Sequence, residues 1–348
     1  MNLTHSKFIV ALSIIGISSS VACAVDVVTR RSDNAQIRGE ITKSDVAEVV
    51  VKRTNGEEVT IETPDIKSVM FDGEPPNLRT ARANESSGAL DLALEKLTEI
   101  DGSYSGGNKA LKTDLEFLIA RVHAKQALID SAKADVGIAA LQAFRGGNKT
   151  NFRYLEANLL EAALHGIKKD AAAGQLLLTE VAQSPVKGYQ LQAGVDLGRL
   201  LLASGDAAGA EQSFQDVVDN SQGDASASGA LYDGMLGLAM CLKQQNKMDE
   251  AIATLDDVIS KAPETESRTL AEAWLRKGDC LKQKAQEKAA LMAYLHVDVL
   301  YSGEPVQHAE ALKRLSELWG PAGHEDRAVD ASARLVERYP NSQWASGG

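Results

Sequence analysis

Three cysteines and six histidines are the residues of this chain best suited to covalent, redox or metal chemistry. Cys23, Cys241 and Cys280 form no C-x-x-C pair, so neither a thioredoxin-like redox pair nor a zinc knuckle is predicted. The histidines are scattered without the HExxH spacing: His5, His123, His165, His296, His308 and His324. Nucleophile-elbow, Walker and dinucleotide-binding glycine motifs do not occur either. The sequence therefore predicts a protein that is not an enzyme and that needs no metal ion or cofactor.

The charge balance excludes one large class of partner. The 348 residues include 37 basic and 48 acidic side chains, which gives a net charge of -11 without any basic block. A nucleic-acid binder needs a clustered positive surface, so no nucleic acid is expected as a partner. With 44% hydrophobic and 24% charged residues, the composition is that of an ordinary folded protein.

The first residues have the pattern of a secretory signal peptide. Lys7 precedes the apolar run FIVALSIIGI, and Ala22 and Ala24 follow with the A-x-A spacing of a cleavage site. We therefore expect residues 1–24 to be removed near Ala24 and the protein to be exported, to the periplasm or the cell envelope. No other stretch approaches the roughly 20 apolar residues that a membrane-spanning helix needs.

A second interpretation of the same segment stays open. Ser20-Val21-Ala22-Cys23 resembles a bacterial lipobox, although serine stands where leucine or valine is usual. In that case Cys23 would hold a lipid anchor.

Residues 25–76 have the content of short β-strands. Five runs rich in valine and isoleucine follow one another: VDVVTR, AQIRGEI, VAEVVVKR, EEVTIET and IKSVMF. Asn55-Gly56 lies between the third and fourth runs and predicts a tight hairpin, because this dipeptide accepts positive backbone angles. Pro75 and Pro76 end the pattern, since proline donates no hydrogen bond to a sheet. We expect a small antiparallel β-barrel-like domain, similar in outline to SH3-like or Sm-like modules.

The residues from 77 to 345 have the pattern of helices that repeat. Alanines that open a second helix recur at intervals of 37, 41, 39 and 38 residues: Ala173, Ala210, Ala251, Ala290 and Ala328. A period of this length predicts stacked helix pairs, each of which needs a neighbour to cover its apolar face. Gly198, Ala239 and Gly278 are expected to let the two helices of a pair approach closely, and large residues such as Tyr294 to fill the space between pairs.

Each period resembles the tetratricopeptide repeat (TPR) in the type and order of its residues. One unit is matched by Met235, Leu238, Ala239, Leu242, Ala251, Leu255 and Pro263, and the next by Trp274, Gly278, Leu281, Ala290 and Tyr294. The resemblance implies a mainly α protein, a right-handed superhelical solenoid of six or seven TPR helix pairs in residues 77–345. The long period is similar to that of exported bacterial members, including Tol-associated periplasmic and outer-membrane-assembly proteins. The phase of residues 101–150 is left open.

In this superfamily the first helices of successive units line a concave groove that contacts extended peptides or partner helices. The resemblance therefore implies a protein or peptide partner and a non-enzymatic scaffold of the bacterial cell envelope. The groove positions carried over to this chain are Asn158, Val195, Arg199, Leu236, Met240, Lys243, Leu275, Asp279, Lys282, Lys313 and Glu317. The alternative is a structural or anchoring envelope component, in which the N-terminal β domain binds and the solenoid is a spacer.

The repeat phase also predicts whether Cys241 and Cys280 form a disulfide. Cys241 and Cys280 both fall at the position of their units where the consensus has a small buried residue. Equivalent positions in neighbouring units lie roughly 10 Å apart, beyond the Cα separation of about 7 Å that a disulfide allows. Two buried free thiols are therefore expected.

Overall fold

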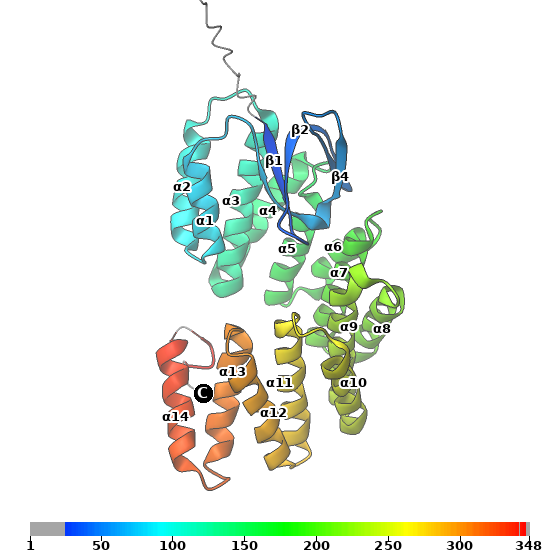
Figure 1. Ribbon diagram of the computed structural model, residues 1–348, viewed down its shortest axis with the longest axis vertical. Coiled ribbons are helices and arrows are strands. Elements are labelled where there is room, and N and C mark those ends of the chain that lie inside the picture. The colour runs from blue at the N-terminus through cyan, green and yellow to red at the C-terminus, as the bar shows by residue number, and fades with distance from the viewer. Residues whose placement is uncertain (1–24, 341, 346–348) are drawn as a thin grey trace, which may run out of the picture.

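The computed structural model describes residues 25–340 and 342–345, in which a small sheet precedes a long run of helices (Figure 1). The predicted signal peptide and the alternative lipid anchor at Cys23 lie outside the described residues. All five predicted strands are present, as β1 (Asp26–Arg30), β2 (Gln36–Ser44), β3 (Glu48–Lys52), β4 (Glu58–Glu62) and β5 (Ile66–Met70). A short 3-10 turn, η1 (Thr63–Asp65), links β4 to β5.

The sheet is open, and this corrects the barrel-like shape expected from the strand count. The strands pair in the order β4-β3-β2-β1-β5, each antiparallel to its neighbour. Among the described residues β4 and β5 each pair with one strand only, so the sheet is not closed into a barrel. Closure requires the two outer strands to meet with a suitable stagger, and the number of strands in a sequence does not reveal whether they do.

The β3–β4 hairpin contains the predicted Asn55-Gly56 turn, but of these two residues only Gly56 has a positive φ, of 86°. The Gly56 N–H donates to the Arg53 carbonyl at 2.9 Å, and the Arg53 N–H donates to the Glu57 carbonyl at 2.8 Å. These bonds define a type I turn followed by a left-handed glycine. Asn55 contributes through its side-chain oxygen, which accepts a hydrogen bond from the Glu57 N–H.

Fourteen α-helices follow in the described residues and form seven consecutive pairs. The first helices of the pairs are α1 (Asn77–Ser86), α3 (Lys109–Ile129), α5 (Tyr154–Ile167), α7 (Lys187–Ser204), α9 (Ser228–Gln244), α11 (Ser267–Gln283) and α13 (Pro305–Trp319). The second helices are α2 (Leu90–Ser103), α4 (Ala134–Gly147), α6 (Ala171–Ala182), α8 (Ala207–Ser221), α10 (Met248–Lys261), α12 (Glu287–Leu300) and α14 (Glu325–Arg338). The phase left open in residues 101–150 is thereby fixed, because α3 and α4 form the second pair.

The turn within a pair has the same backbone geometry in six of the seven pairs. The residue two positions before the second helix has a positive φ, between 57° and 90°, at Gly88, Lys169, Gly205, Asn246, Ala285 and Gly323. The following N–H then bonds back into the first helix, as from Gln286 to the Leu281 carbonyl at 2.9 Å. This is the Schellman helix end, which favours glycine because a side chain strains the left-handed backbone.

Small residues allow the close helix contacts that the repeat pattern predicts. A Cβ atom on Gly278 of α11 would lie 2.5 Å from the ring of Tyr294, which is fully buried on α12. A Cβ atom on Gly198 of α7 would lie 2.6 Å from the ring of Phe214 on α8. The predicted close approaches at Gly198 and Gly278 are therefore confirmed, and any larger residue there would overpack the pair.

The two described cysteines are buried free thiols, as the repeat phase predicts. Cys241 lies on α9 and Cys280 on α11, so they occupy first helices of neighbouring pairs. Burial raises the pKa of Cys241 to about 11 and also raises the pKa of Cys280. The reactive thiolate is therefore scarce at neutral pH at both positions.

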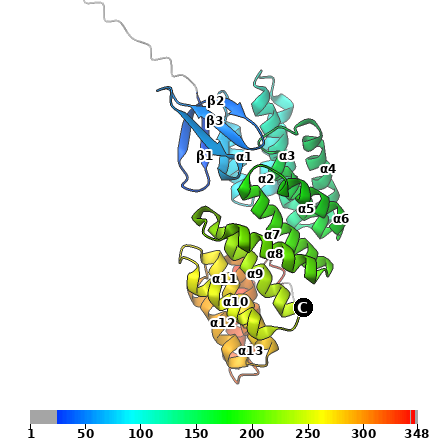
Figure 2. The same cartoon turned by 90° about the vertical axis from the view of Figure 1, so that its right-hand side faces the viewer.

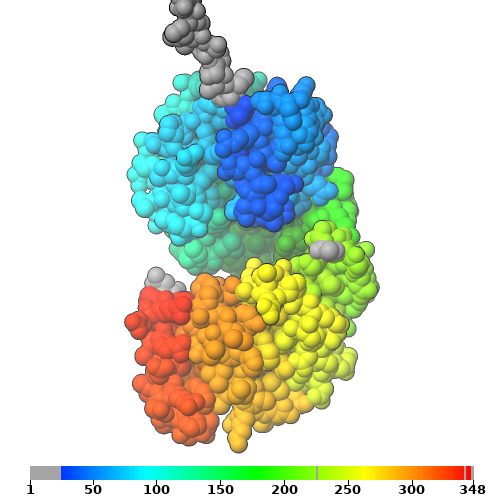
Figure 3. Space-filling model, in the orientation of Figure 1, coloured from blue at the N-terminus to red at the C-terminus, as the bar shows by residue number. Residues whose placement is uncertain are grey.

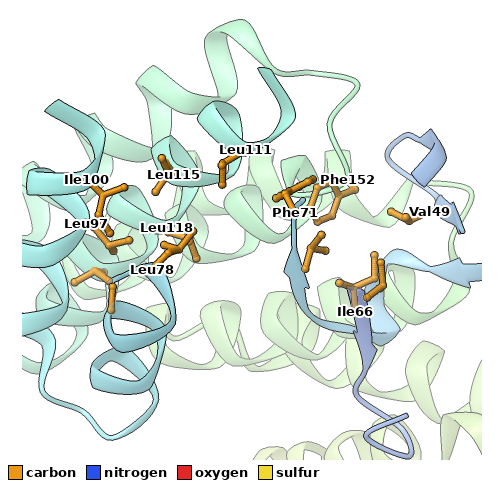
Figure 4. Packing of buried hydrophobic residues seen from close by; sticks show 14 of the residues in the cluster. Val49, Ile66, Phe71, Leu78, Leu97, Ile100, Leu111, Leu115, Leu118 and Phe152 are labelled. Carbon is orange, nitrogen blue, oxygen red and sulfur yellow. The ribbon is translucent and has the colours of Figure 1, made fainter. Parts of the chain in front are cut away.

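The sheet and the first helices share one hydrophobic core. Ile66 of β5 and the adjoining Phe71 belong to the same buried cluster as Leu78 of α1, Leu97 of α2 and Leu115 of α3 (Figure 4). The sheet also reaches the later pairs, because Val46 and Ala47 pack against a cluster on α5, α6 and α7. The division into a β domain at 25–76 and a solenoid at 77–345 stays a prediction, since the core is continuous between them.

The helix pairs follow a curved path. In Figure 1 the helices α1 to α5 lie beside the sheet, α6 to α10 turn downward, and α11 to α14 run back beneath the first pairs. The view turned by 90° places the sheet on one side of the upper helices (Figure 2). A space-filling view shows the last pairs, in orange and red, separated by a gap from the first pairs, in cyan (Figure 3). None of the helices in the described residues is long and apolar enough to cross a membrane.

Candidate partner-binding face

The first helices of successive pairs lie side by side from α3 to α13, since each contacts the next. The sheet packs against the earlier members of this row, whereas the described part of the row from α9 to α13 is free of it except at the start of α9. A pocket of about 410 Å³ lies on this free part, between α7, α8, α9, α11 and the start of α13. We call it the inner-face pocket.

The inner-face pocket has an apolar floor and a charged rim. Its floor includes Leu202, Phe214, Leu236 and Met240. Its rim is formed by side chains from four first helices, which are Arg199, Asp233, Glu272, Arg276 and Gln307, together with Glu266 and Arg268 at the start of α11. A concave site with an apolar floor and a few fixed polar groups is typical of a surface that holds one side chain of a binding partner.

Ion pairs between neighbouring helix pairs hold the rim in place. Arg199 contacts Asp233 at 3.2 Å and Asp196 at 3.3 Å. Arg276 contacts Glu310 at 2.6 Å and Glu272 at 2.8 Å. Because Arg199 and Arg276 each have two or more carboxylate partners, these rim charges are held in a framework of ion pairs and are not free.

The pKa directions agree with this framework. Burial raises the pKa of Asp196, and the nearby Asp233 carboxylate raises it further. Gln192 and Arg199 act in the opposite direction but do not cancel this rise. Burial would lower the pKa of Arg276, but its carboxylate neighbours outweigh burial and raise it. Arg276 therefore stays charged at every pH at which the protein is folded.

Asp279 is the central residue of the network behind the rim. Its carboxylate accepts hydrogen bonds from Arg276 at 2.7 Å, from the Tyr294 hydroxyl at 2.9 Å and from Arg314 at 3.2 Å. Lys243 lies 3.8 Å away and completes the set. Asp279 thus joins α9, α11, α12 and α13. It was expected to face a partner, but in the structure its side chain is buried and links these helices.

The other predicted groove residues fall into three groups. Arg199, Leu236 and Met240 lie together on the inner-face pocket. Lys282 and Lys313 contact Glu317, at 3.1 and 3.7 Å, further along the same row of helices. The third group is buried and offers no side chain to a partner, and it comprises Asn158, Val195 and Leu275.

The buried group has a common physical cause. The positions taken from the repeat pattern point partly toward the neighbouring first helix, so Val195 and Leu275 fill the space between helices. Asn158 on α5 is also fully buried, and neither polar atom of its side chain has a hydrogen-bond partner among the described residues.

Six rim residues were not among the predicted groove positions: Asp233, Glu266, Arg268, Glu272, Arg276 and Gln307. A usable signal exists, because oppositely charged residues one repeat apart pair with each other. Arg199 pairs with Asp233, and Arg276 pairs with Glu310, in each case 34 residues later. A search for opposite charges 34 residues apart, a few residues less than the alanine spacing, would have found both pairs.

The described residues contain no group of three or more His, Cys, Asp or Glu side chains arranged to hold a metal ion. The ionisable side chains around the pocket are bonded mainly to one another, with two exceptions. Glu266 and Arg268 on the rim have no ion pair within the part of the chain that is described. They are the charges that a bound partner could engage without breaking an existing contact.

Comparison with known proteins agrees with the repeat. A tetratricopeptide repeat family model matches residues 201–273, and a second one matches residues 307–342. The chain therefore contains tetratricopeptide repeats, in segments that together cover less than half of it. No curated protein matches the sequence.

Solved structures show the same fold at low sequence identity. A tetratricopeptide repeat protein from Parabacteroides merdae has a TM-score of 0.53 at 14% identity, over 78% of this chain and 98% of that one. A Rap protein complexed with competence and sporulation factor has a TM-score of 0.52 at 12% identity, over 77% of this chain and 76% of that one. The apo form of RapI has a TM-score of 0.50 at 8% identity, with the same coverage. These likenesses support the helix-pair architecture and nothing finer.

Proposed function

We propose that this chain is a non-enzymatic scaffold of the cell envelope that holds a segment of a protein partner on the first helices of its last four pairs. Tetratricopeptide folds commonly mediate protein–protein interactions, which supports the general class. The envelope location rests on the signal-peptide pattern of residues 1–24 and on nothing in the described structure.

The inner-face pocket is the observation on which the binding mode rests. It combines an apolar floor at Leu236 and Met240 with a rim whose ion pairs are already formed. A partner that inserts one apolar side chain desolvates the floor and meets a rigid rim, so little side-chain freedom is lost on binding. We therefore expect an apolar anchor residue in the partner segment.

The charge distribution argues against recognition of a free C-terminal carboxylate as the main contact. Arg199, Lys243 and Arg276 are each bound to aspartate or glutamate, so a carboxylate ligand would have to displace an existing partner. A clamp for a free carboxylate needs unpaired cations. Arg268 is the one rim cation without a partner among the described residues.

The anchoring role of the N-terminal sheet stays a second prediction. The shared core with α1, α2 and α3 holds the sheet against the helices, so it is not a freely hinged module. An anchoring role would have to use a surface that the sheet still exposes.

A capture experiment with matched variants tests the proposed function. Immobilised protein is incubated with envelope extract of the source cells, and the retained proteins are identified. Met240→Glu places a charge on the pocket floor and should abolish capture of the partner, as should Arg199→Glu combined with Lys243→Glu. Met292→Glu is the control, because Met292 is an exposed methionine on α12. Equal capture by the Met240→Glu and Met292→Glu variants would refute the pocket as the binding site.

A further inference from the structure

The free edge of the sheet is a second surface with the properties of a binding site, independent of the inner-face pocket. β4 is an outer strand that pairs with β3 alone. Residues of β4 also line a cavity of about 770 Å³, whose opposite wall belongs to the start of α7, the residues before α9 and the first turn of α9. The cavity therefore lies along a strand that has no second neighbour in the described residues.

The hydrogen-bond pattern shows which backbone groups face this cavity. The Arg53 N–H donates to the Glu57 carbonyl, and the Thr63 N–H donates to the Ala47 carbonyl. In an antiparallel pair, bonded and non-bonded positions alternate, so Val59 and Ile61 also bond to β3. Glu58, Thr60 and Glu62 lie at the alternate positions, and their N–H groups point away from the sheet. Thr60 faces Val50 at one of these alternate positions, so its backbone does not bond to β3, and no other described segment bonds to it.

The side chains along this edge define the chemistry that would bind. Glu58, Thr60 and Glu62 are exposed on one face of β4, and both carboxylates lack an ion pair or hydrogen bond among the described residues. Leu191, Ala227 and Ala230 form an apolar part of the opposite wall. The cationic Lys187 of that wall is held by Asp224 at 2.6 Å and does not neutralise the edge.

We propose that β4 accepts an extended segment of a partner protein as an additional strand, one in which basic residues alternate with apolar ones. The outward N–H and carbonyl groups of β4 would supply the main-chain hydrogen bonds. Basic residues would lie across from Glu58 and Glu62, and opposite charges at facing positions stabilise a strand pair. The apolar residues would face the wall formed by Leu191 and Ala230.

A second copy of this chain fits the edge poorly. Antiparallel pairing of two β4 strands centred on Thr60 would place Glu58 of one copy opposite Glu62 of the other. Like charges at facing positions destabilise a strand pair, and charged edge residues are a common protection against self-association. The same two carboxylates that favour a basic segment therefore disfavour a dimer through β4.

The test uses the full chain and a synthetic probe, a capped heptapeptide in which lysine and valine alternate. We expect millimolar peptide to slow hydrogen exchange at the Thr60 N–H and to bind with measurable affinity. A peptide with glutamate in place of lysine should not bind. A lysine–valine peptide methylated on alternate backbone nitrogens should not bind either, because it cannot complete the ladder, and this control leaves the protein unchanged.

Variants of the chain add a second arm to the test. The double variant Glu58→Lys, Glu62→Lys should weaken binding by about tenfold, because two attractive facing pairs become repulsive. Thr60→Pro removes an outward N–H, which an edge strand tolerates, and should abolish binding, whereas Thr60→Val should keep it.

The proposal is overturned if Thr60 gains no protection, or if the glutamate peptide binds as well as the lysine peptide. It is also overturned if the chain alone forms a dimer that Thr60→Pro dissociates, because a second copy would then be the occupant. None of these outcomes bears on the inner-face pocket, because the variants that test the pocket lie on helices α7 and α9 and not on β4.

Discussion

Ion pairs link the first helices of neighbouring pairs in both the N-terminal and the C-terminal half of the molecule, and we call each of these sets a ladder. The sheet covers only the N-terminal ladder. Arg153, which directly precedes α5, has a side chain that is 4% exposed and contacts Asp114 at 3.3 Å and Glu156 at 3.0 Å. Its guanidinium also lies over the ring of Phe152, which packs in the core shared with the sheet. Arg314 on α13 has equivalent partners, Asp279 and Glu310, yet its side chain is 23% exposed.

This contrast suggests how one repeat can serve two purposes. Where the sheet covers the ladder, the side chains of Arg153 and Asp114 are almost fully buried and contribute to the folded state only as a matched pair. Burial would raise the pKa of Glu85, but its hydrogen bonds and ion pairs with Arg121 and Lys125 outweigh burial and lower it. Where the ladder is uncovered, a similar framework surrounds a pocket that a partner can reach.

The largest expected effect comes from removing the covered arginine. Arg153→Met leaves Asp114 and Glu156 without their main cation in a buried site, which should lower the free energy of unfolding by about 3–5 kcal/mol. Arg314→Met removes an equivalent but partly exposed cation and should cost about 1 kcal/mol. Urea unfolding followed by circular dichroism measures both. Equal losses would show that the sheet does not change the role of the ladder.

A second prediction concerns the largely buried carboxylate Asp298 at the far end of the uncovered half. Asp298 on α12 contacts His308 at 2.8 Å, and Arg334 of α14 bonds to the same carboxylate. Burial would raise the pKa of Asp298, but His308 and Arg334 outweigh burial and lower it to about 2.

Because this pKa lies below the unfolded value of about 3.9, Asp298 stabilises the protein above pH 4 and loses its effect as the pH falls toward 2. The stability difference between the wild type and Asp298→Asn should therefore shrink by about 2 kcal/mol over that range. Urea titrations at a series of pH values provide the measurement. A difference that stays constant with pH would mean that the lowered pKa is not a property of the folded state.

The smallest expected effect concerns the repeated turn. Ala285 occupies the left-handed position at φ 57°, where Gly205 and Gly323 stand in two of the other pairs. Ala285→Gly should raise the free energy of unfolding by about 0.5–1 kcal/mol, because glycine removes the strain but adds freedom to the unfolded chain. Asn246→Gly is the control and should change stability less, since asparagine tolerates this conformation. A melting temperature lowered by Ala285→Gly would contradict the strain argument.

Much of the fold can be predicted from the sequence because local residue patterns determine it. The five strands, the turn at Gly56 and the period set by Ala210, Ala251 and Ala290 follow from residue types a few positions apart. What the sequence did not reveal depends on contacts between distant segments. The open sheet edge at β4 and the core shared by Phe71 and Leu115 are of this kind.

The candidate site was predicted only in part, for a related reason. The repeat phase identified the helices, and three of the positions it gave, Arg199, Leu236 and Met240, lie on one pocket in the structure. It did not distinguish side chains that face the pocket from those that face the next helix, so Leu275 was included although it is fully buried. A helical position turned by one residue changes its direction by about 100°, which the consensus alone does not resolve.

The central claim is that the uncovered first helices, and not the covered ones, bind the partner. A photo-crosslinking amino acid placed in intact cells tests this most directly at three positions. Met240 lies on the inner-face pocket, Leu160 lies on α5 in a cavity bounded by the sheet, and Met292 is exposed on α12. We predict a discrete crosslinked protein from position 240 and none from positions 160 and 292. A crosslink of equal yield from 160 or 292, or none from 240, would contradict the account.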